Sequence, residues 1–225
     1  MAGRRPLTVN EEQRLAERLA AESPRDRALV TCQWMTGFRI FEVLSLRYDS
    51  VWRGDEMLPS IGIAPLHLKG GYGRTRWVPI LPELRASLQS LRNWLRLHFE
   101  LEPDLPLFVS RVGDADGRAQ PLSSERARVI MQRIFAAAGI RNDGRLGTHT
   151  LRKTWARRVY EASGYDIMVL RDALGHSDVS ISQRYLEVGR ERVLEAIRAG
   201  WSCQESTQLP VKNKPHVRRA ARSAA

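Results

Sequence analysis

The sequence predicts a mainly α-helical protein with a small antiparallel β insert near its first third. Apolar residues recur at helical spacing over most of the chain, and capping residues precede several of these runs. Residues 50–80 differ, because short β-like runs alternate there with glycines. The 225 residues are 43% hydrophobic, which suffices for one ordinary domain or two small ones.

Three helices are expected in the N-terminal part of the chain. Thr8 and Glu11 have the spacing of a capping box, which opens a helix over residues 8–21. A serine followed by a proline begins the next helix, over residues 23–37, which ends at a glycine. A third helix, over residues 39–46, carries a short apolar stripe.

The β insert is expected to contain three strands. The extended runs occupy residues 51–52, 61–63 and 76–80. The segment LKGGYGRTRWVPI (residues 68–80) places glycines between the last two runs, which is typical of a β-hairpin.

A long helix follows, opened by Pro82 and marked by leucines at helical spacing. Arg85, Arg92 and Arg96 lie on the side away from those leucines. We interpret this basic stripe as a solvated face in preference to a phosphate-contacting one.

Helices also dominate the C-terminal half. A loop rich in Pro, Gly and Asp over residues 101–122 separates the long helix from a serine-capped helix that ends near Gly139. Further helices are expected at residues 149–162, 166–174, 179–186 and 191–199.

The charge balance points to a polyanionic partner. Lys and Arg number 36 against 25 Asp and Glu, a net charge of +11, and nucleic acid is the first candidate. Two cysteines exclude a disulfide framework and match no zinc-ligand spacing. No apolar run approaches the roughly 18 residues of a membrane helix, and no secretory signal is evident, so we expect a cytoplasmic protein.

The basic charge is concentrated at the C-terminal end. Residues 210–225 contain five Lys and Arg and no acidic residue. We therefore expect a folded domain over residues 1–205 and a basic, disordered tail over residues 206–225. Two interpretations of this tail stay open: it is solvated without a partner, or it contacts DNA phosphates.

Several polar side chains stand at helix starts or loop junctions, where they can be presented to a ligand. Each alone has an ordinary explanation, such as surface charge, capping or a place in the core. The candidates in chain order are Arg39, Lys69, His149, Arg152, His176 and, nine residues further on, Tyr185.

Taken together, their order and spacing resemble the catalytic domain of the tyrosine recombinases, the phage-integrase family. The resemblance covers about residues 7–199. TGFRIFEVLSLRYDSV resembles the first conserved box, and LKGGYGRTRWVPI resembles the hairpin that carries the catalytic lysine. THTLRKTWA resembles the His-x-x-Arg box, and LRDALGHSDVSISQRYLEV resembles the final box.

This resemblance implies the fold of the DNA breaking-rejoining enzymes and assigns roles by position. Arg39 and Arg152 would stabilise the pentacoordinate phosphorane, with His176 as a further donor. Tyr185 would be the nucleophile. His149 would remove the proton of that phenol, and Lys69 would protonate the leaving 5′-oxygen.

Two further residues have supporting roles in this picture. Glu42, one helical turn after Arg39, would pair with it and hold its guanidinium in place. Lys153 stands where many relatives carry histidine, and we expect it to contact phosphate, with a catalytic role left open.

The resemblance implies a site-specific DNA recombinase that works through a 3′-phosphotyrosyl intermediate without metal, ATP or another cofactor. Double-stranded DNA is the expected partner, with four protomers on two sites, and an accessory DNA-bending or targeting protein can take part. We expect a bacterial, phage or plasmid protein associated with the nucleoid.

The chain resembles members that lack the N-terminal DNA-clamping domain, which predicts weak and salt-dependent DNA binding. Two alternatives stay open. One is a type IB-like topoisomerase, and the other is a DNA-binding regulator that keeps the fold without catalysis.

Overall fold

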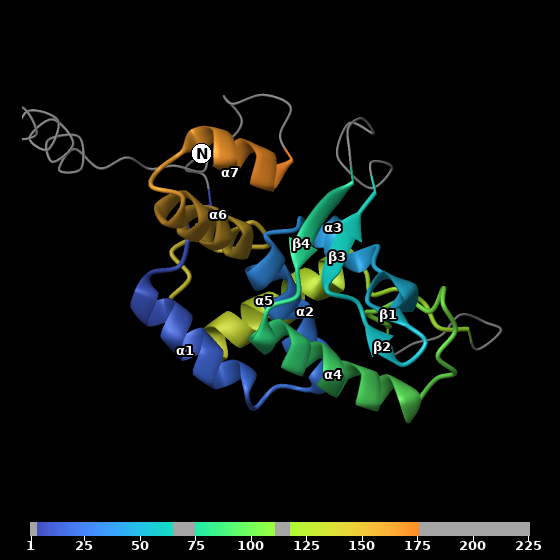
Figure 1. Ribbon diagram of the computed structural model, residues 1–225. Helices are drawn as coiled ribbons and strands as arrows, with labels where there is room; N and C mark the ends of the chain where they lie inside the picture. The colour runs from blue at the N-terminus through green and yellow to red at the C-terminus, as the bar shows by residue number, and fades with distance from the viewer. Residues whose placement is uncertain (1–3, 65–74, 111–117, 176–225) are drawn as a thin grey trace, which may run out of the picture. The chain divides into compact units, whose positions relative to one another are not determined.

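The computed structural model describes residues 4–64, 75–110 and 118–175. These residues belong to the first of two compact units, Met1–Leu186, and the second unit, Glu187–Ala225, falls outside the described residues. Helices make up most of the described part, and short antiparallel strands interrupt them once (Figure 1). The predicted class, mainly α with a small antiparallel β insert, is therefore confirmed.

The helices begin and end close to the predicted positions. In chain order they are α1 (Val9–Leu19), α2 (Pro24–Thr36), α3 (Ile40–Leu44), the 3-10 turn η1 (Tyr48–Ser50), α4 (Pro82–Arg96), α5 (Ser124–Ala137), α6 (Thr150–Ala162) and α7 (Ile167–Leu174). No helix among the described ranges is both long and apolar enough to cross a bilayer. The helices predicted at residues 179–186 and 191–199 lie outside the described residues.

The predicted caps account for these boundaries. The Thr8 hydroxyl accepts a hydrogen bond from the Glu11 amide, and the Glu11 carboxylate accepts one from the Thr8 amide, which completes the capping box of α1. The Ser23 hydroxyl accepts from the Asp26 amide at the start of α2. Helix α3 is shorter than the expected 39–46: its last residue is Leu44, and Ser45 is its C-cap.

The β insert differs from the expected three strands. Strand β1 (Trp52–Arg53) pairs with β2 (Glu56–Met57), and β3 (Ser60–Ile63) pairs with β4 (Arg76–Pro79), as two separate two-stranded antiparallel sheets. No apolar alternation marks β2, because this strand is only two residues long and begins with an exposed glutamate. The predicted hairpin is present as β3–β4, and its turn residues lie outside the described ranges.

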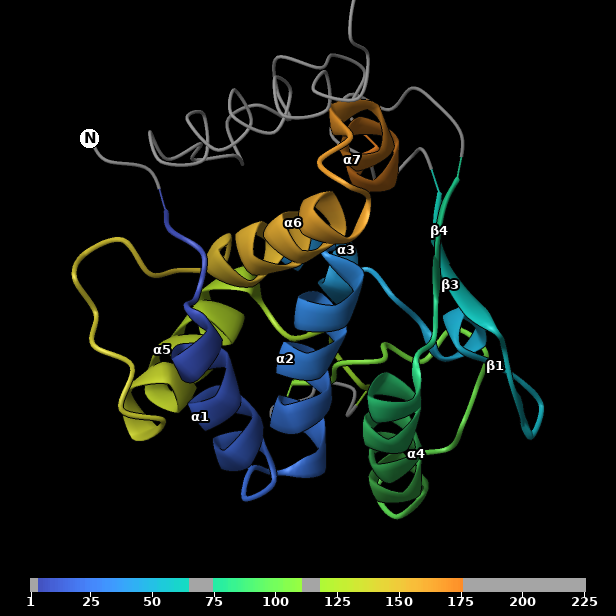
Figure 2. The same cartoon turned by 60° about the vertical axis from the view of Figure 1, so that its left-hand side comes forward.

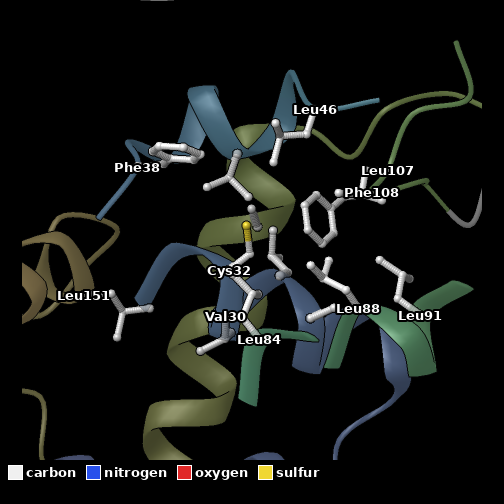
Figure 3. Close-up of a cluster of buried hydrophobic side chains, with 14 of the residues drawn as sticks. Val30, Cys32, Phe38, Leu46, Leu84, Leu88, Leu91, Leu107, Phe108 and Leu151 are labelled. Atoms are coloured by element: carbon white, nitrogen blue, oxygen red, sulfur yellow. The ribbon is translucent and has the colours of Figure 1, made fainter. Parts of the chain in front are cut away.

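Helix α2 lies at the centre of the core, between α4 and α6 (Figure 2). Val30 and Cys32 of this helix pack with Phe38 and with Leu84 and Leu88 of α4 (Figure 3). A helix surrounded in this way has no solvated face, so its ends are held by packing on several sides. Burial also raises the pKa of the Cys32 thiol to about 12, so this cysteine is an inert core residue.

The basic stripe predicted on α4 is solvated only in part. Arg85 and Arg96 are exposed, but Arg92 is only 7% exposed. Its Nε donates to the Tyr48 hydroxyl at 2.8 Å, and its guanidinium also pairs with the Asp55 carboxylate. The prediction was wrong for Arg92 because the turn between β1 and β2 covers that part of α4.

A smaller apolar cluster joins α7 to α6. Leu170 and Leu174 of α7 are fully buried against Ala156 of α6, with Trp155 and Val159 at its border. This packing fixes the C-terminal end of α7, where Gly175 adopts the left-handed conformation with a φ of 65°.

The turn between α2 and α3 requires a glycine for two reasons. Gly37 has a φ of 63°, and a Cβ built on it would lie 2.4 Å from the Trp155 ring. We expect Gly37→Ala to lower the free energy of unfolding by about 3 kcal/mol, because left-handed strain and the clash with Trp155 add together. Denaturant unfolding measures this change.

Gly139→Ala is the matched control. Gly139 has a φ of 65°, but a Cβ there would meet no atom within 4 Å among the described residues. We expect it to cost only about 1 kcal/mol. Equal losses for the two variants would contradict the role given to the Gly37–Trp155 contact.

Candidate active site

A fully buried carboxylate, that of Glu42, lies at the centre of the candidate site. Its Oε1 accepts a hydrogen bond from the Arg39 guanidinium at 2.7 Å, and its Oε2 accepts one from the Arg39 amide at 2.6 Å. Oε2 also accepts from the Arg76 guanidinium at 3.0 Å, and Arg152 Nη1 lies 3.8 Å from it. One carboxylate therefore gathers three arginines.

The start of α3 positions the first of these arginines. Arg39 is the residue before α3, and Glu42 occupies the third position of the helix, so the carboxylate reaches back to the Arg39 amide as in a capping box. The Arg39 side chain is 14% exposed, with one edge held by Glu42. The predicted pairing of Arg39 with Glu42 is present.

Helix α6 supplies Arg152, which is fully buried. Its Nη1 donates to the Gly37 carbonyl at 2.5 Å, and its Nη2 donates to the Leu174 carbonyl at 3.0 Å. Arg152 thus connects the turn before α3 with the last residue of α7. The structure brings Arg39, Glu42 and Arg152 together, as the sequence predicted.

Strand β4 supplies Arg76, which the sequence analysis did not single out. Arg76 is 6% exposed, donates to the Leu174 carbonyl at 2.9 Å and lies over the Phe38 ring at 4.5 Å. The sequence contains a sign of this burial. Arg76 lies two residues before Val78 and four before Ile80, so it points to the same side of the strand as these two buried residues. An arginine at an inward position of a strand indicates a buried ionic partner.

The cluster gathers several cations at one place. Three guanidinium groups face one carboxylate among the described residues. Burial, together with the neighbouring Arg152, lowers the pKa of Arg76 to about 10, and Glu42 opposes this shift. Planar guanidinium groups bind anions with several oxygens well, so the gathered arginines suit such a ligand.

His149 lies beside this cluster, directly before α6 and three residues before Arg152. The residue as a whole is exposed, although protein atoms surround part of its ring, and its Nδ1 lies 3.5 Å from the Thr148 hydroxyl. The pKa of His149 lies below its usual value because surrounding protein atoms desolvate the ring, and because four cations repel the protonated form. These cations are Arg152, Arg39, Arg4 and Lys153. A neutral imidazole at pH 7 can accept a proton.

The other candidate residues are distributed as follows. Lys153 follows Arg152 on α6, is half-buried and contributes to the positive field at His149. Lys69, His176 and Tyr185 lie outside the described residues. In the sequence, His176 directly follows Gly175, the residue that ends α7 next to the carbonyl shared by Arg76 and Arg152.

Comparisons with known proteins agree with the resemblance. The profile of the Phage integrase family matches residues 5–192. Tyrosine recombinase XerC of Rhodospirillum centenum is 33% identical over 196 residues, which cover 84% of this chain and 52% of that protein. Tyrosine recombinase XerD of Corynebacterium glutamicum is 31% identical over 174 residues, which cover 77% of this chain and 52% of that protein. The chain thus spans about half the length of both relatives.

Solved structures share the fold. The XerA recombinase matches with a TM-score of 0.67 and 23% identity, covering 89% of this chain and 64% of that one. The XerH site-specific recombinase, bound to a palindromic difH substrate in a post-cleavage complex, matches with a TM-score of 0.67 and 23% identity, covering 88% of this chain and 52% of that one. The predicted recombinase catalytic-domain fold is confirmed.

The electrostatic account of His149 can be tested directly. We expect an NMR titration to give a His149 pKa below about 6.5, and Arg4→Gln to raise it by removing one repelling cation. The effect of this exposed arginine should weaken at high salt. Arg85→Gln, on an exposed part of α4, is the control and should leave the value unchanged.

The lowered pKa of His149 also makes the stability of the protein depend on pH. Because the unfolded chain protonates His149 at a higher pH than the folded protein does, this residue should make the protein less stable as the pH falls through about 6.5. A His149 pKa that is unmoved by Arg4→Gln would contradict the proposed repulsion.

Proposed function

This chain belongs to the phage integrase family, and on that premise we propose that it is a site-specific DNA recombinase. In this proposal it cleaves and rejoins DNA through a 3′-phosphotyrosyl intermediate. The observation that carries the proposal is the gathering of Arg39, Arg76 and Arg152 around the buried Glu42 carboxylate. A phosphodiester under attack is an anion suited to these guanidinium groups.

The arginines act on the phosphate. In the transition state the phosphorus has five oxygen neighbours, and negative charge builds up on the non-bridging oxygens. Arg39 and Arg152 are held by Glu42 and by backbone carbonyls before substrate arrives, so little reorganisation is needed when that charge develops. Lys153 would add a contact to a neighbouring phosphate.

The nucleophile and the proton transfers are assigned by the family pattern. The phenol oxygen of Tyr185 attacks phosphorus, and neutral His149 takes its proton. The bond from phosphorus to the 5′-oxygen breaks, and Lys69 gives that oxygen a proton. His176 donates a hydrogen bond to a non-bridging oxygen. These steps balance, because one P–O bond forms as another breaks.

The chemistry requires no external energy source. The phosphotyrosyl link conserves the energy of the broken phosphodiester, and a 5′-hydroxyl of another strand attacks it in the reverse sense. The arginines supply the charge stabilisation that metal ions supply in other phosphoryl transfers. We therefore propose a reaction independent of metal and ATP.

Double-stranded DNA is the proposed substrate and partner. The related XerH structure holds a palindromic difH substrate, and a related lambda integrase structure is a dimer bound to a core site. Exchange between two duplexes requires a tyrosine for each of the four strands, so we propose four protomers on two sites. We propose that a DNA-bending or targeting protein assists this assembly, and that the chain associates with the nucleoid through its DNA substrate.

Covalent capture tests the proposal. We expect the protein to form a denaturation-resistant adduct with a pool of nicked duplexes of randomised sequence. Tyr185→Phe should abolish it, and Arg152→Lys should slow it about 100-fold, since a point charge replaces a planar fork in the transition state. Arg85→Lys, on exposed α4 surface, is the matched control. Sequencing the captured DNA identifies the target.

The other outcomes separate the alternatives. Retained binding with no adduct from the wild-type protein would indicate a DNA-binding regulator. An adduct with plasmid relaxation, but no exchange between two captured sites, would indicate a type IB-like topoisomerase.

The basic tail generates a separate prediction. Residues 210–225 carry five Lys and Arg. If they contact phosphates, deleting them should weaken DNA binding and reduce the slope of log affinity against log salt by up to about 0.9 per lost contact. Fluorescence anisotropy over a salt series measures both quantities, and an unchanged slope would refute a role for the tail.

A further inference from the structure

We infer that Arg76 is a positioning residue: it engages the Glu42 carboxylate and so keeps Arg152 on its backbone carbonyls, directed at the scissile phosphate. This inference rests on the proposed function. It concerns a side chain that none of the sequence patterns singled out, and it is carried by the contacts around one carboxylate oxygen.

Several donors lie close to Oε2 of Glu42. It already accepts the Arg39 amide at 2.6 Å and the Arg76 guanidinium at 3.0 Å. Arg152 Nη1 stands 3.8 Å away, which is within ion-pair range but beyond hydrogen-bond distance. Arg76 therefore holds the place that a direct Arg152–Glu42 pair would need.

Removing Arg76 would release that place. At a fully buried site a carboxylate and a guanidinium attract strongly, so Arg152 would move from the Gly37 carbonyl into a hydrogen-bonded pair with Glu42. That pair would neutralise Arg152 and turn its fork away from the phosphate. Binding of the rest of the DNA would persist, because phosphate contacts elsewhere supply most of the affinity.

Arg76 also joins the hairpin to the end of α7. Its Nη1 donates to the Leu174 carbonyl, which accepts the Arg152 Nη2 as well. The C-terminal carbonyls of a helix carry partial negative charge, so two guanidinium groups are favourable there. One arginine thus fixes α3, β4 and α7 relative to Arg152.

The geometry requires an arginine. Two nitrogens of one planar group reach two acceptors on different elements, while the plane lies over the Phe38 ring. A lysine ammonium is a point charge without a fork, so it cannot reproduce both bonds with the same stacking.

The test compares Arg76→Lys and Arg76→Gln with a matched control, Arg92→Lys. Arg92 is as buried as Arg76, with 7% against 6% exposed, but it bonds Tyr48 away from the site. On nicked duplexes recovered by covalent capture, we expect both Arg76 variants to slow single-turnover cleavage at saturating DNA about tenfold, with Kd changed less than about twofold. Arg92→Lys should leave the cleavage rate unchanged. Circular dichroism establishes that each variant is folded at the assay temperature.

A double-mutant cycle on the cleavage rate distinguishes a positioning role from a purely structural one. We expect Glu42→Gln and Arg76→Gln each to slow cleavage about tenfold, and the pair to be no slower than either alone, because a neutral amide then replaces the charged carboxylate that would trap Arg152. Multiplying losses would overturn the inference. If Arg76→Gln does not fold, Arg76→Lys carries the comparison.

The outcomes also separate this inference from the proposed function. Cleavage by the wild-type protein together with wild-type rates in the Arg76 variants would overturn the positioning role alone. No adduct from the wild-type protein on any duplex would overturn the recombinase proposal and this inference with it.

Discussion

The arrangement of the site depends on the cost of burying one carboxylate. Glu42 is fully removed from water, and a buried carboxylate is stable only when hydrogen-bonded and matched by positive charge. The chain meets this requirement with a backbone amide and guanidinium groups drawn from α3, β4 and α6. The same carboxylate that stabilises the fold locally therefore also gathers the three arginines that we propose as the anion site.

The rest of the domain holds the ends of these elements in register. Helix α2 is packed on several sides, and Gly37 is its C-cap. The Gly37 carbonyl accepts a hydrogen bond from Arg152, and because glycine has no side chain, the Trp155 ring can lie close to it. Helix α7 packs on α6 and presents the Leu174 carbonyl to two guanidinium groups. Both carbonyls are backbone atoms at helix ends, so their positions follow from core packing.

The sequence predicted what local rules determine. Caps and apolar spacing located the helices, and the three-residue spacing of Arg39 and Glu42 predicted their pair. Features that depend on tertiary neighbours were missed: Arg92 was assigned to solvent although the turn at Asp55 covers it, and the short strand β2 has no period of its own. Arg76 was not predicted, because its ionic partner, Glu42, lies on a different element, 34 residues away in the sequence. The roles of Lys69, His176 and Tyr185 rest on resemblance and stay predictions.

The central claim is that the arginines gathered by Glu42 form the binding place of the scissile phosphate. The most direct measurement is a crystal structure of the protein with orthovanadate bridging the two ends of a cleaved duplex, since vanadate adopts the five-coordinate geometry of the transition state. The account predicts equatorial vanadate oxygens within hydrogen-bond distance of Arg39 and Arg152, with Glu42 still bound to Arg39 and Arg76. Vanadate bound elsewhere, or Arg152 paired with Glu42 and turned from the DNA, would contradict it.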